Sequence, residues 1–195
     1  PPLPPSTPRP VAGLDNVEDY SGFVTLAPGP AGFDMAYLTP PSGSDHGKAE
    51  HAMTLSHVFI GRDGRAGTVS VLDADTCTCC TTSVARLGDD LVVAYRDHAP
   101  GEVRDISVVR RVGGRWLAPS AVHADGWRIN ACPTNGPVLA VSGRRVTTAW
   151  FTGARDERRV NVAASTARGV RITRAGSAPA CATCLRCSRT NSAIA

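Results

Sequence analysis

Two stretches of this sequence match each other without a gap at a step of 55 positions, the distance from Cys77 to Cys132. The first stretch ends at Tyr95 and the second at Trp150, and each contains an apolar segment, a glycine turn and a second apolar segment in the same order. A further step of equal length reaches Cys187. Such periods are typical of repeat architectures, in which one unit cannot bury both of its faces and stacks on its neighbours. The chain is therefore expected to fold as an array of similar units.

Each unit contains about four short β segments. Apolar runs such as Leu91-Val92-Val93-Ala94-Tyr95 alternate with turns such as Gly113-Gly114, and no stretch has helical periodicity. Four-stranded units of this length predict an all-β fold, a β-propeller built of four-stranded blades. A non-propeller β-sandwich is the alternative. The sequence holds roughly three blades and the start of a fourth, at approximately residues 22–72, 77–125, 132–175 and 187–195.

A closed propeller has at least about four blades. The propeller segment, residues 13–195, is therefore expected to be part of a larger protein or to close its ring with the remaining blades or a partner chain. Residues 1–12 are rich in proline and are typical of an extended linker.

The cysteine content and the beginning of the sequence favour export. Seven cysteines are many for a cytosolic domain, and the chain starts on proline rather than methionine. We expect an extracytoplasmic location, which is periplasmic, secreted or membrane-anchored through a removed N-terminal signal. No apolar run is long enough to form a transmembrane segment.

The charge pattern disfavours nucleic-acid binding. The formal net charge is +4, and Lys48 is the only lysine among 21 basic residues. Arginine is suited to phosphate and carboxylate recognition, but these arginines are scattered along the chain and few aromatic residues accompany them. A bias of codon usage towards arginine explains the composition equally well.

Several motifs occur in order between about residues 73 and 165. They are Cys77-Thr78-Cys79-Cys80, Tyr95-Arg96-Asp97, Arg104-Asp105-Ile106 and Cys132-Pro133-Thr134-Asn135-Gly136-Pro137. In these motifs the sequence resembles bacterial sialidase-like proteins with BNR (Asp-box) repeats, in particular an exported subgroup with CxCC and CPxNGP motifs. The resemblance implies a six-bladed propeller of which this chain is a part, and an exo-sialidase type of glycoside hydrolase or a glycan-binding protein.

The Asp-boxes themselves are degenerate. Ala167 stands where the box has aspartate, and Gly113-Gly114-Arg115-Trp116 keeps the glycines and the tryptophan on a shortened turn. Because these boxes are turns between outer strands, their loss says little about activity.

Sialidase chemistry needs arginines around the substrate carboxylate, a tyrosine nucleophile with a glutamate, and an acid. One cluster offers such groups, and its candidate catalytic residues are Tyr95, Arg96, Asp97, Arg104 and Asp105. The alternative is that Tyr95 is a core aromatic residue like Trp150, with Arg96-Asp97 and Arg104-Asp105 forming ion pairs in turns. The full arginine triad cannot be assigned from this segment.

The cysteines carry a different hypothesis. If each unit is a blade, Cys77, Cys132 and Cys187 begin successive inner strands, and thiolates that converge there are ligands for Cu(I) or Zn. The candidate metal ligands are Cys77, Cys79, Cys80 and Cys132, and Cys181 and Cys184 extend the series. The alternative is a disulfide between the Cys77–Cys80 group and Cys132 that joins neighbouring blades. An odd number of cysteines leaves at least one thiol unpaired within the chain.

Two functions from different classes follow. The first is a glycosidase or glycan-binding protein, in which Trp127 and Trp150 either stack on sugar rings or are buried between blades. The second is a non-catalytic propeller that uses its cysteines to hold Cu or Zn, or its rim to hold a partner.

Overall fold

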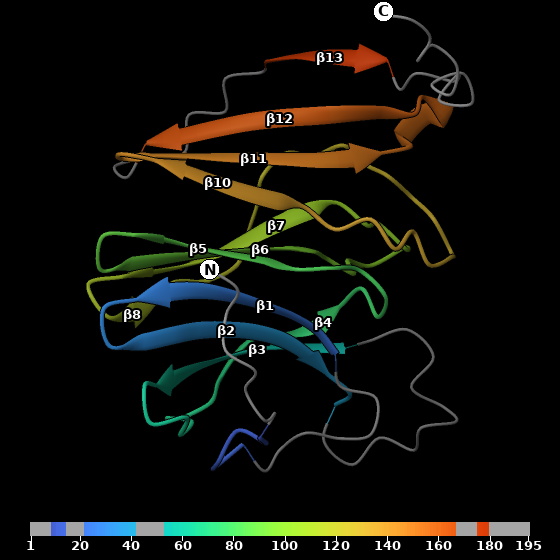
Figure 1. Ribbon diagram of the computed structural model, residues 1–195. Helices are drawn as coiled ribbons and strands as arrows, with labels where there is room; N and C mark the ends of the chain where they lie inside the picture. The colour runs from blue at the N-terminus through green and yellow to red at the C-terminus, as the bar shows by residue number, and fades with distance from the viewer. Residues whose placement is uncertain (1–8, 15–21, 42–52, 167–174, 180–195) are drawn as a thin grey trace, which may run out of the picture.

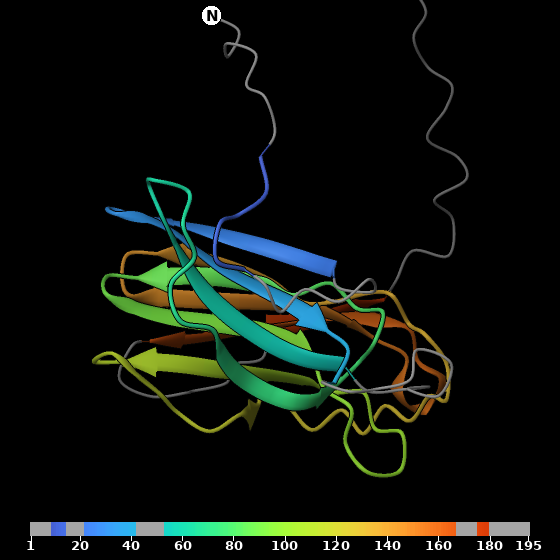
Figure 2. The same ribbon diagram turned by 90° about the horizontal axis from the view of Figure 1, so that it is seen from below.

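The computed structural model describes residues 9–14, 22–41, 53–166 and 175–179. The described residues form three antiparallel sheets stacked one on another (Figure 1). The expected all-β fold is confirmed, and the described part of the chain forms an open stack of sheets. Viewed at right angles, the strands of the three sheets overlie one another (Figure 2).

Each sheet takes its strands in chain order. The first contains β1 (Gly22–Gly29), β2 (Gly32–Thr39), β3 (Met53–Gly61) and β4 (Ser70–Thr76). The second contains β5 (Ser83–Leu87), β6 (Asp90–Arg96), β7 (Ile106–Val112) and β8 (Arg115–Trp116), with β9 (Ser120–Ala121) also paired to β7. The third contains β10 (Val138–Ser142), β11 (Arg145–Thr152), β12 (Arg159–Thr166) and β13 (Ala175–Pro179). A short 3₁₀ turn, Ala154–Asp156, joins β11 to β12.

The sequence repeat corresponds to one sheet. Strands β5 and β10 begin 55 positions apart, as do β6 and β11, and the pairing register agrees, because Val84 pairs with Val93 as Leu139 pairs with Thr148. The turns between these strands contain Gly88 at φ 66° and Gly143 at φ 57°, a backbone conformation that glycine adopts without steric cost. The predicted order of strands and turns in the second and third units is thus confirmed.

The second sheet is buried on both faces. Leu91, Val93 and Tyr95 pack against the first sheet, and Val92 and Ala94 pack against the third. A sheet covered on both sides needs apolar residues at successive positions rather than alternate ones. This explains the continuous apolar run of β6.

Buried polar groups also join the first and second sheets. The Asp34 carboxylate is fully buried, and the His57 ring nitrogen Nε2 lies 3.0 Å from its Oδ1. Arg86 pairs with the same carboxylate, and Arg111 Nη1 lies 3.9 Å from it. The His57 ring also contacts Trp116 edge to face. We call these five residues the Asp34 cluster; burial is the main cause that lowers the pKa of His57 below its ordinary value of 6.5.

The first strands of the three sheets lie next to one another, with β5 between β1 and β10. The Thr82 hydroxyl donates to the Phe23 carbonyl at 3.0 Å, and the Leu139 N–H donates to Ser83 Oγ at 3.0 Å. The segments that precede β5 and β10 are therefore brought together at one edge of the stack. The cysteine motifs lie on these two segments.

Several details differ from the expected boundaries. β4 extends to Thr76, beyond the expected end of the first unit at residue 72. The shortened Asp-box forms the turn from β7 to β8, with Trp116 partly buried against the core. Residues 1–8 of the expected linker and the expected fourth unit, residues 187–195, lie outside the described residues.

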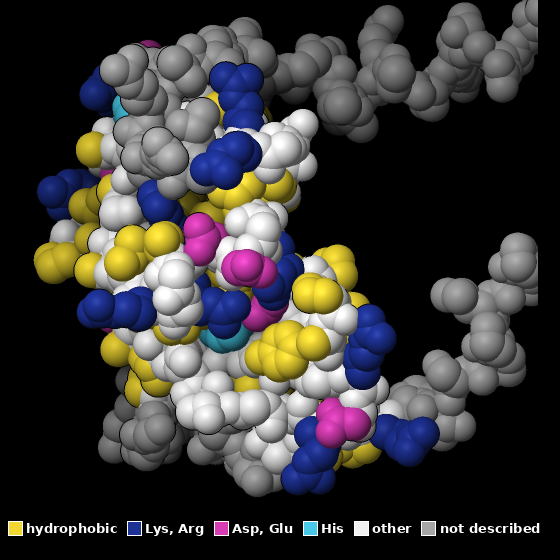
Figure 3. Space-filling view, turned by 90° about the vertical axis from the view of Figure 1, so that its left-hand side faces the viewer, with side chains coloured by type: hydrophobic (Ala, Val, Ile, Leu, Met, Phe, Trp, Pro, Cys, Tyr) yellow, Lys and Arg dark blue, Asp and Glu magenta, His cyan; other side chains and the backbone are white. Residues whose placement is uncertain are grey.

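Charged residues are spread over the surface. On the side shown in Figure 3, arginines lie among hydrophobic and acidic side chains and do not gather into one patch. Within the described ranges, no helix has the length and apolar character needed to cross a membrane.

Candidate cysteine centre

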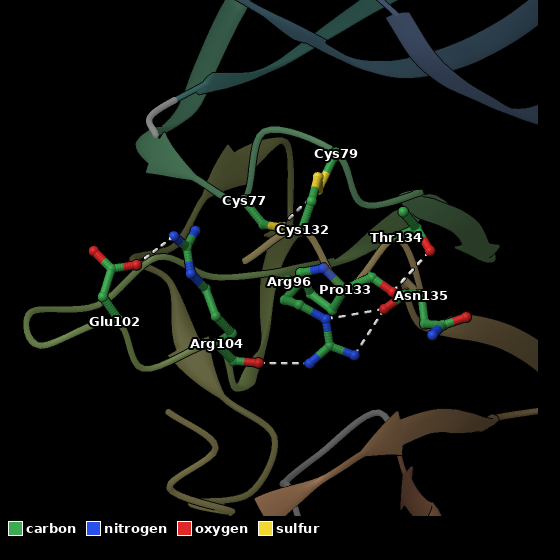
Figure 4. The surroundings of a disulfide bond; sticks show 9 residues. All are labelled: Cys77, Cys79, Arg96, Glu102, Arg104, Cys132, Pro133, Thr134 and Asn135. Atoms are coloured by element: carbon green, nitrogen blue, oxygen red, sulfur yellow. Dashed lines mark hydrogen bonds and ion pairs between the residues drawn. A yellow bond between two sulfur atoms is a disulfide. The ribbon is translucent and has the colours of Figure 1, made fainter. Parts of the chain in front are cut away.

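A disulfide joins the second and third sheets. Cys79 lies in the segment between β4 and β5, Cys132 lies before β10, and their sulfurs are bonded with the Cα atoms 5.9 Å apart (Figure 4). Of the alternatives left open by the sequence, a disulfide between the Cys77–Cys80 group and Cys132 is therefore present.

Two further thiols lie beside this disulfide. Cys77 and Cys80 are unbonded and buried, at 2% and 1% exposure. Cys77 Sγ lies 3.9 Å from Cys79 Sγ, and the sulfurs of Cys77, Cys79 and Cys80 all lie within 4.8 Å of one another. Cys132 is exposed and Cys79 is half-buried. We call these four residues the cysteine centre; two of them are buried, one is half-buried and one is exposed.

The environment favours a negative charge on Cys77. A hydrogen bond from the Cys80 thiol is the main cause that lowers the pKa of Cys77 to about 6, against the opposing effect of burial. The Cys79 backbone and the positive charges of Arg104 and Arg96 act in the same direction. The pKa of Cys80 is raised because its proton is held by Cys77. Of the two buried thiols, Cys77 is therefore the one that loses its proton more readily.

Arg96 holds the segments around the centre together. Its guanidinium is 2% exposed and donates to three backbone carbonyls, those of Arg104 at 2.5 Å, Asn135 at 2.7 and 2.9 Å, and Phe151 at 2.9 Å. Arg96 also lies over the Trp127 ring, whose centroid is 4.8 Å from Cζ. The planar fork of arginine suits this arrangement, because one side chain satisfies three backbone carbonyls at once.

Arg104 supplies a second buried positive charge. It is 3% exposed, and its Nη2 donates to Glu102 Oε2 at 2.6 Å. Within the described part of the chain, its Nε–H is buried and donates to no acceptor. A buried unpaired donor costs free energy unless an acceptor completes it. Arg104 thus offers a hydrogen-bond donor to an anionic group beside Cys77 (Figure 4).

The glycine of the CPxNGP motif has a packing reason. A Cβ atom on Gly136 would lie 1.7 Å from the Thr81 carbonyl oxygen, so a side chain does not fit there. The Gly136 N–H also donates to Thr81 Oγ1 at 3.2 Å. The segment of the CxCC motif and the CPxNGP motif are therefore in direct contact. This close approach explains why glycine occupies position 136 of the CPxNGP motif.

The five candidate catalytic residues are mostly buried, and the protein itself supplies their partners. The Tyr95 hydroxyl donates to Asp73 and the side chain is 1% exposed. Asp97 accepts from the His98 N–H at 2.8 Å and from Ser107 at 3.0 Å. Asp105 accepts the N–H groups of Gly126 and Trp127, at 2.8 and 3.0 Å, and Arg96 and Arg104 are bonded as described above.

The alternative of ion pairs in turns was wrong. Among the described residues, Arg104 pairs with Glu102 rather than Asp105, and Arg96 donates to carbonyls rather than to Asp97. Tyr95 is a core residue, as is Trp150 at the equivalent position of the third sheet. A catalytic role for the five residues stays a prediction.

The sulfur spacing fits a soft metal ion. A tetrahedral ion with Zn–S bonds of about 2.3 Å places its ligand sulfurs roughly 3.8 Å apart. The Cys77–Cys79 separation of 3.9 Å is close to that value. Cys132 lies close enough to be a fourth ligand, because its sulfur is bonded to that of Cys79. The Cys79–Cys132 disulfide must open before these two sulfurs can bind a metal ion. Cys181, Cys184 and Cys187 lie outside the described residues.

A polar pocket lies next to the centre. It has a volume of about 440 Å³ and is lined by Trp127, Ile129, Pro133, Asn135, Phe151, Gly153, Asp156 and Arg158. Trp127 and Phe151 contact each other edge to face at 5.6 Å. Asp156 in this lining has a positive φ of 59°, and two residues next to lining residues in the sequence also have positive φ, Thr134 at 57° and Arg155 at 60°. Such conformations are uncommon and cluster at binding sites.

Comparison with known proteins identifies no relative of this chain. No family model matches the chain, and no curated protein is detectably similar to it.

Proposed function

We propose that the chain is a non-catalytic propeller-type scaffold whose cysteine centre binds a soft metal ion, Cu(I) or Zn. The observation that carries this proposal is the approach of three cysteine sulfurs within 4.8 Å of one another at a buried sheet edge. Thiolates are strong ligands for both ions. The positive charges of Arg96 and Arg104 offset the negative charge that such ligands bring into the protein.

Cu(I) is the ion that the geometry favours. Cys77, Cys79 and Cys80 form a compact sulfur-only set, while the fourth sulfur, Cys132, belongs to another segment and is exposed. Structural zinc sites take four ligands, whereas soft thiolate sets select Cu(I) without that requirement.

A metal titration tests this function. All variants carry Ser in place of Cys181, Cys184 and Cys187, so that only the centre contributes thiols. The fully reduced protein is titrated anaerobically with the Cu(I)–bicinchoninate complex, and transfer of one Cu(I) per chain is expected. Cys77→Ser should weaken binding strongly. Absence of transfer to the reduced protein would contradict the proposal, and a preference for Zn²⁺ in a parallel titration would reassign the ion.

The scaffold is proposed to be part of a propeller because the outer face of the third sheet is left partly uncovered by the described residues. Ala94 is fully buried against that sheet, but Ala149 at the equivalent position is only half-buried, and on the same face Val138 and Val160 are 63% and 43% exposed. This face is equivalent to the one with which the second sheet binds the third, so a further four-stranded sheet of the same repeat fits it. An extracytoplasmic location is supported by the disulfide, since such bonds persist in oxidising compartments.

A second candidate function is glycan binding. The polar pocket combines an aromatic and proline wall with the side chains of Asp156, Arg158 and Asn135, a combination that suits a polyhydroxylated ligand. Weaker retention of glycans by Arg158→Ala on an immobilised glycan panel would support it. A fluorogenic sialoside assay tests hydrolysis: turnover that Tyr95→Phe abolishes would favour the glycosidase, and no turnover would exclude it for this chain.

A further inference from the structure

We propose that Cys132 is a reaction site for an external thiol, and that this reaction opens the metal site. The inference rests on the proposed metal binding and adds how the site is controlled. Its basis is the unequal exposure of the two bonded cysteine residues and the place of each sulfur after the bond breaks.

Solvent reaches the disulfide from one side. Cys132 is exposed, Cys79 is half-buried, and Cys77 and Cys80 are buried. Thiol–disulfide exchange requires the attacking thiolate to reach a sulfur and also depends on which sulfur is attacked. A dissolved thiol therefore meets Cys132 first.

The exchange step needs no reactant other than the external thiol. An external thiolate attacks Cys132 Sγ, a new sulfur–sulfur bond forms between them, and the Cys79–Cys132 bond breaks. The electron pair of the broken bond leaves on Cys79 Sγ. With a dithiol, the second thiol then displaces Cys132, which is released as a reduced cysteine while the dithiol becomes a disulfide.

The leaving sulfur enters the buried set. Cys79 Sγ lies 3.9 Å from Cys77 Sγ and within 4.8 Å of Cys80 Sγ, so its release completes three free sulfur ligands without a large movement. The charge that it carries appears where Arg96 and Arg104 already face the cysteines. The unpaired Nε–H of Arg104 provides a donor for this added negative charge.

The opposite attack gives a different product. If a thiol attacked Cys79, that sulfur would be capped by the incoming group and Cys132 would leave into solvent. The buried set would then have two free sulfurs. The choice of the attacked sulfur thus decides whether the site becomes able to bind Cu(I).

Two variants separate the roles of the bonded cysteines. Cys132→Ser and Cys79→Ser both remove the disulfide and lose the same loop constraint, but only Cys79→Ser removes a sulfur from the buried set. In the background without Cys181, Cys184 and Cys187, Cys132→Ser should take Cu(I) from bicinchoninate without any reductant. For Cys79→Ser we expect affinity lower by more than about 100-fold, beyond the loss seen when residues that only orient ligands are altered.

Mass spectrometry identifies the attacked sulfur. The oxidised protein is treated with glutathione, quenched with N-ethylmaleimide and digested, and the glutathione adduct is expected on Cys132. An adduct on Cys79 would overturn the proposed reaction site. The proposal would also be overturned if larger thiols reduced the disulfide and glutathione formed no adduct.

The outcomes distinguish the two proposals. If the oxidised wild-type protein binds Cu(I) as tightly as Cys132→Ser, the disulfide does not control the site, although metal binding stands. If neither Cys132→Ser nor the reduced wild-type protein binds Cu(I), the metal function fails, and the adduct on Cys132 still reports the exchange chemistry.

Discussion

Removal of the disulfide should lower the stability of the chain by an amount that the structure allows us to calculate. Cys79 and Cys132 are 53 positions apart, so the bond closes a long loop in the unfolded chain. The chain-entropy relation gives about 4 kcal/mol at 25 °C for a loop of this length. Cys132→Ala should therefore lower the free energy of unfolding by about 4 kcal/mol. The exposed position of Cys132 means that the change leaves no buried cavity to add to this loss.

Urea unfolding followed by tryptophan fluorescence measures this loss. The midpoint of the oxidised wild-type protein is compared with that of Cys132→Ala, each with and without a phosphine reductant. The reductant should destabilise the wild-type protein to the level of the variant and leave the variant unchanged. The reasoning is refuted if Cys132→Ala unfolds at the wild-type midpoint, or if the reductant shifts both proteins equally. Cys77→Ala serves as the control, because its response to the reductant should match that of the wild-type protein.

Three further outcomes are expected. Arg96→Leu should cost about 3 kcal/mol or more in urea unfolding, because three buried or part-buried carbonyls lose their donor; a loss below about 1 kcal/mol would show that water replaces the guanidinium. Gly136→Ala should destabilise the chain strongly, whereas Gly67→Ala, whose new Cβ would meet its nearest neighbour at 3.4 Å, should be tolerated. Burial lowers the pKa of His57, so the unfolded chain takes up a proton before the folded one, and stability should fall as pH decreases below about 6.5. His57→Gln should reduce this dependence of the unfolding free energy on pH. The charged groups that face the His57 ring are Asp34, Arg86 and Arg111.

The repeat allowed the sheets to be predicted, because the spacing of apolar runs depends only on local sequence. Leu91 to Tyr95 is apolar at every position since two sheets cover it, and Gly88 and Gly143 mark the same turn in successive units. The start of β3 at Met53 could not be predicted from composition, because Met53–Ser56 follows a polar stretch of sequence and its place in the strand is set by pairing with β2.

The centre was predicted only in part. The cysteine motifs indicated that Cys77–Cys80 and Cys132 meet, but sequence spacing cannot decide between a metal and a disulfide, since both need the same convergence. The role of Arg96 was not foreseen. Its three acceptors are backbone carbonyls of residues far apart in the chain, and a carbonyl leaves no mark in the sequence. Gly136, between Asn135 and Pro137, is the sequence feature that permits the close contact with Thr81, because glycine has no Cβ atom.

The most direct test of the account is X-ray absorption at the copper K-edge of the Cu(I)-loaded, reduced protein in the background without Cys181, Cys184 and Cys187. The account predicts a first coordination shell made of sulfur alone, with three sulfurs from Cys77, Cys79 and Cys80, and the same shell in Cys132→Ser. A shell containing nitrogen or oxygen ligands, or an unchanged sulfur shell in Cys77→Ser, would contradict it.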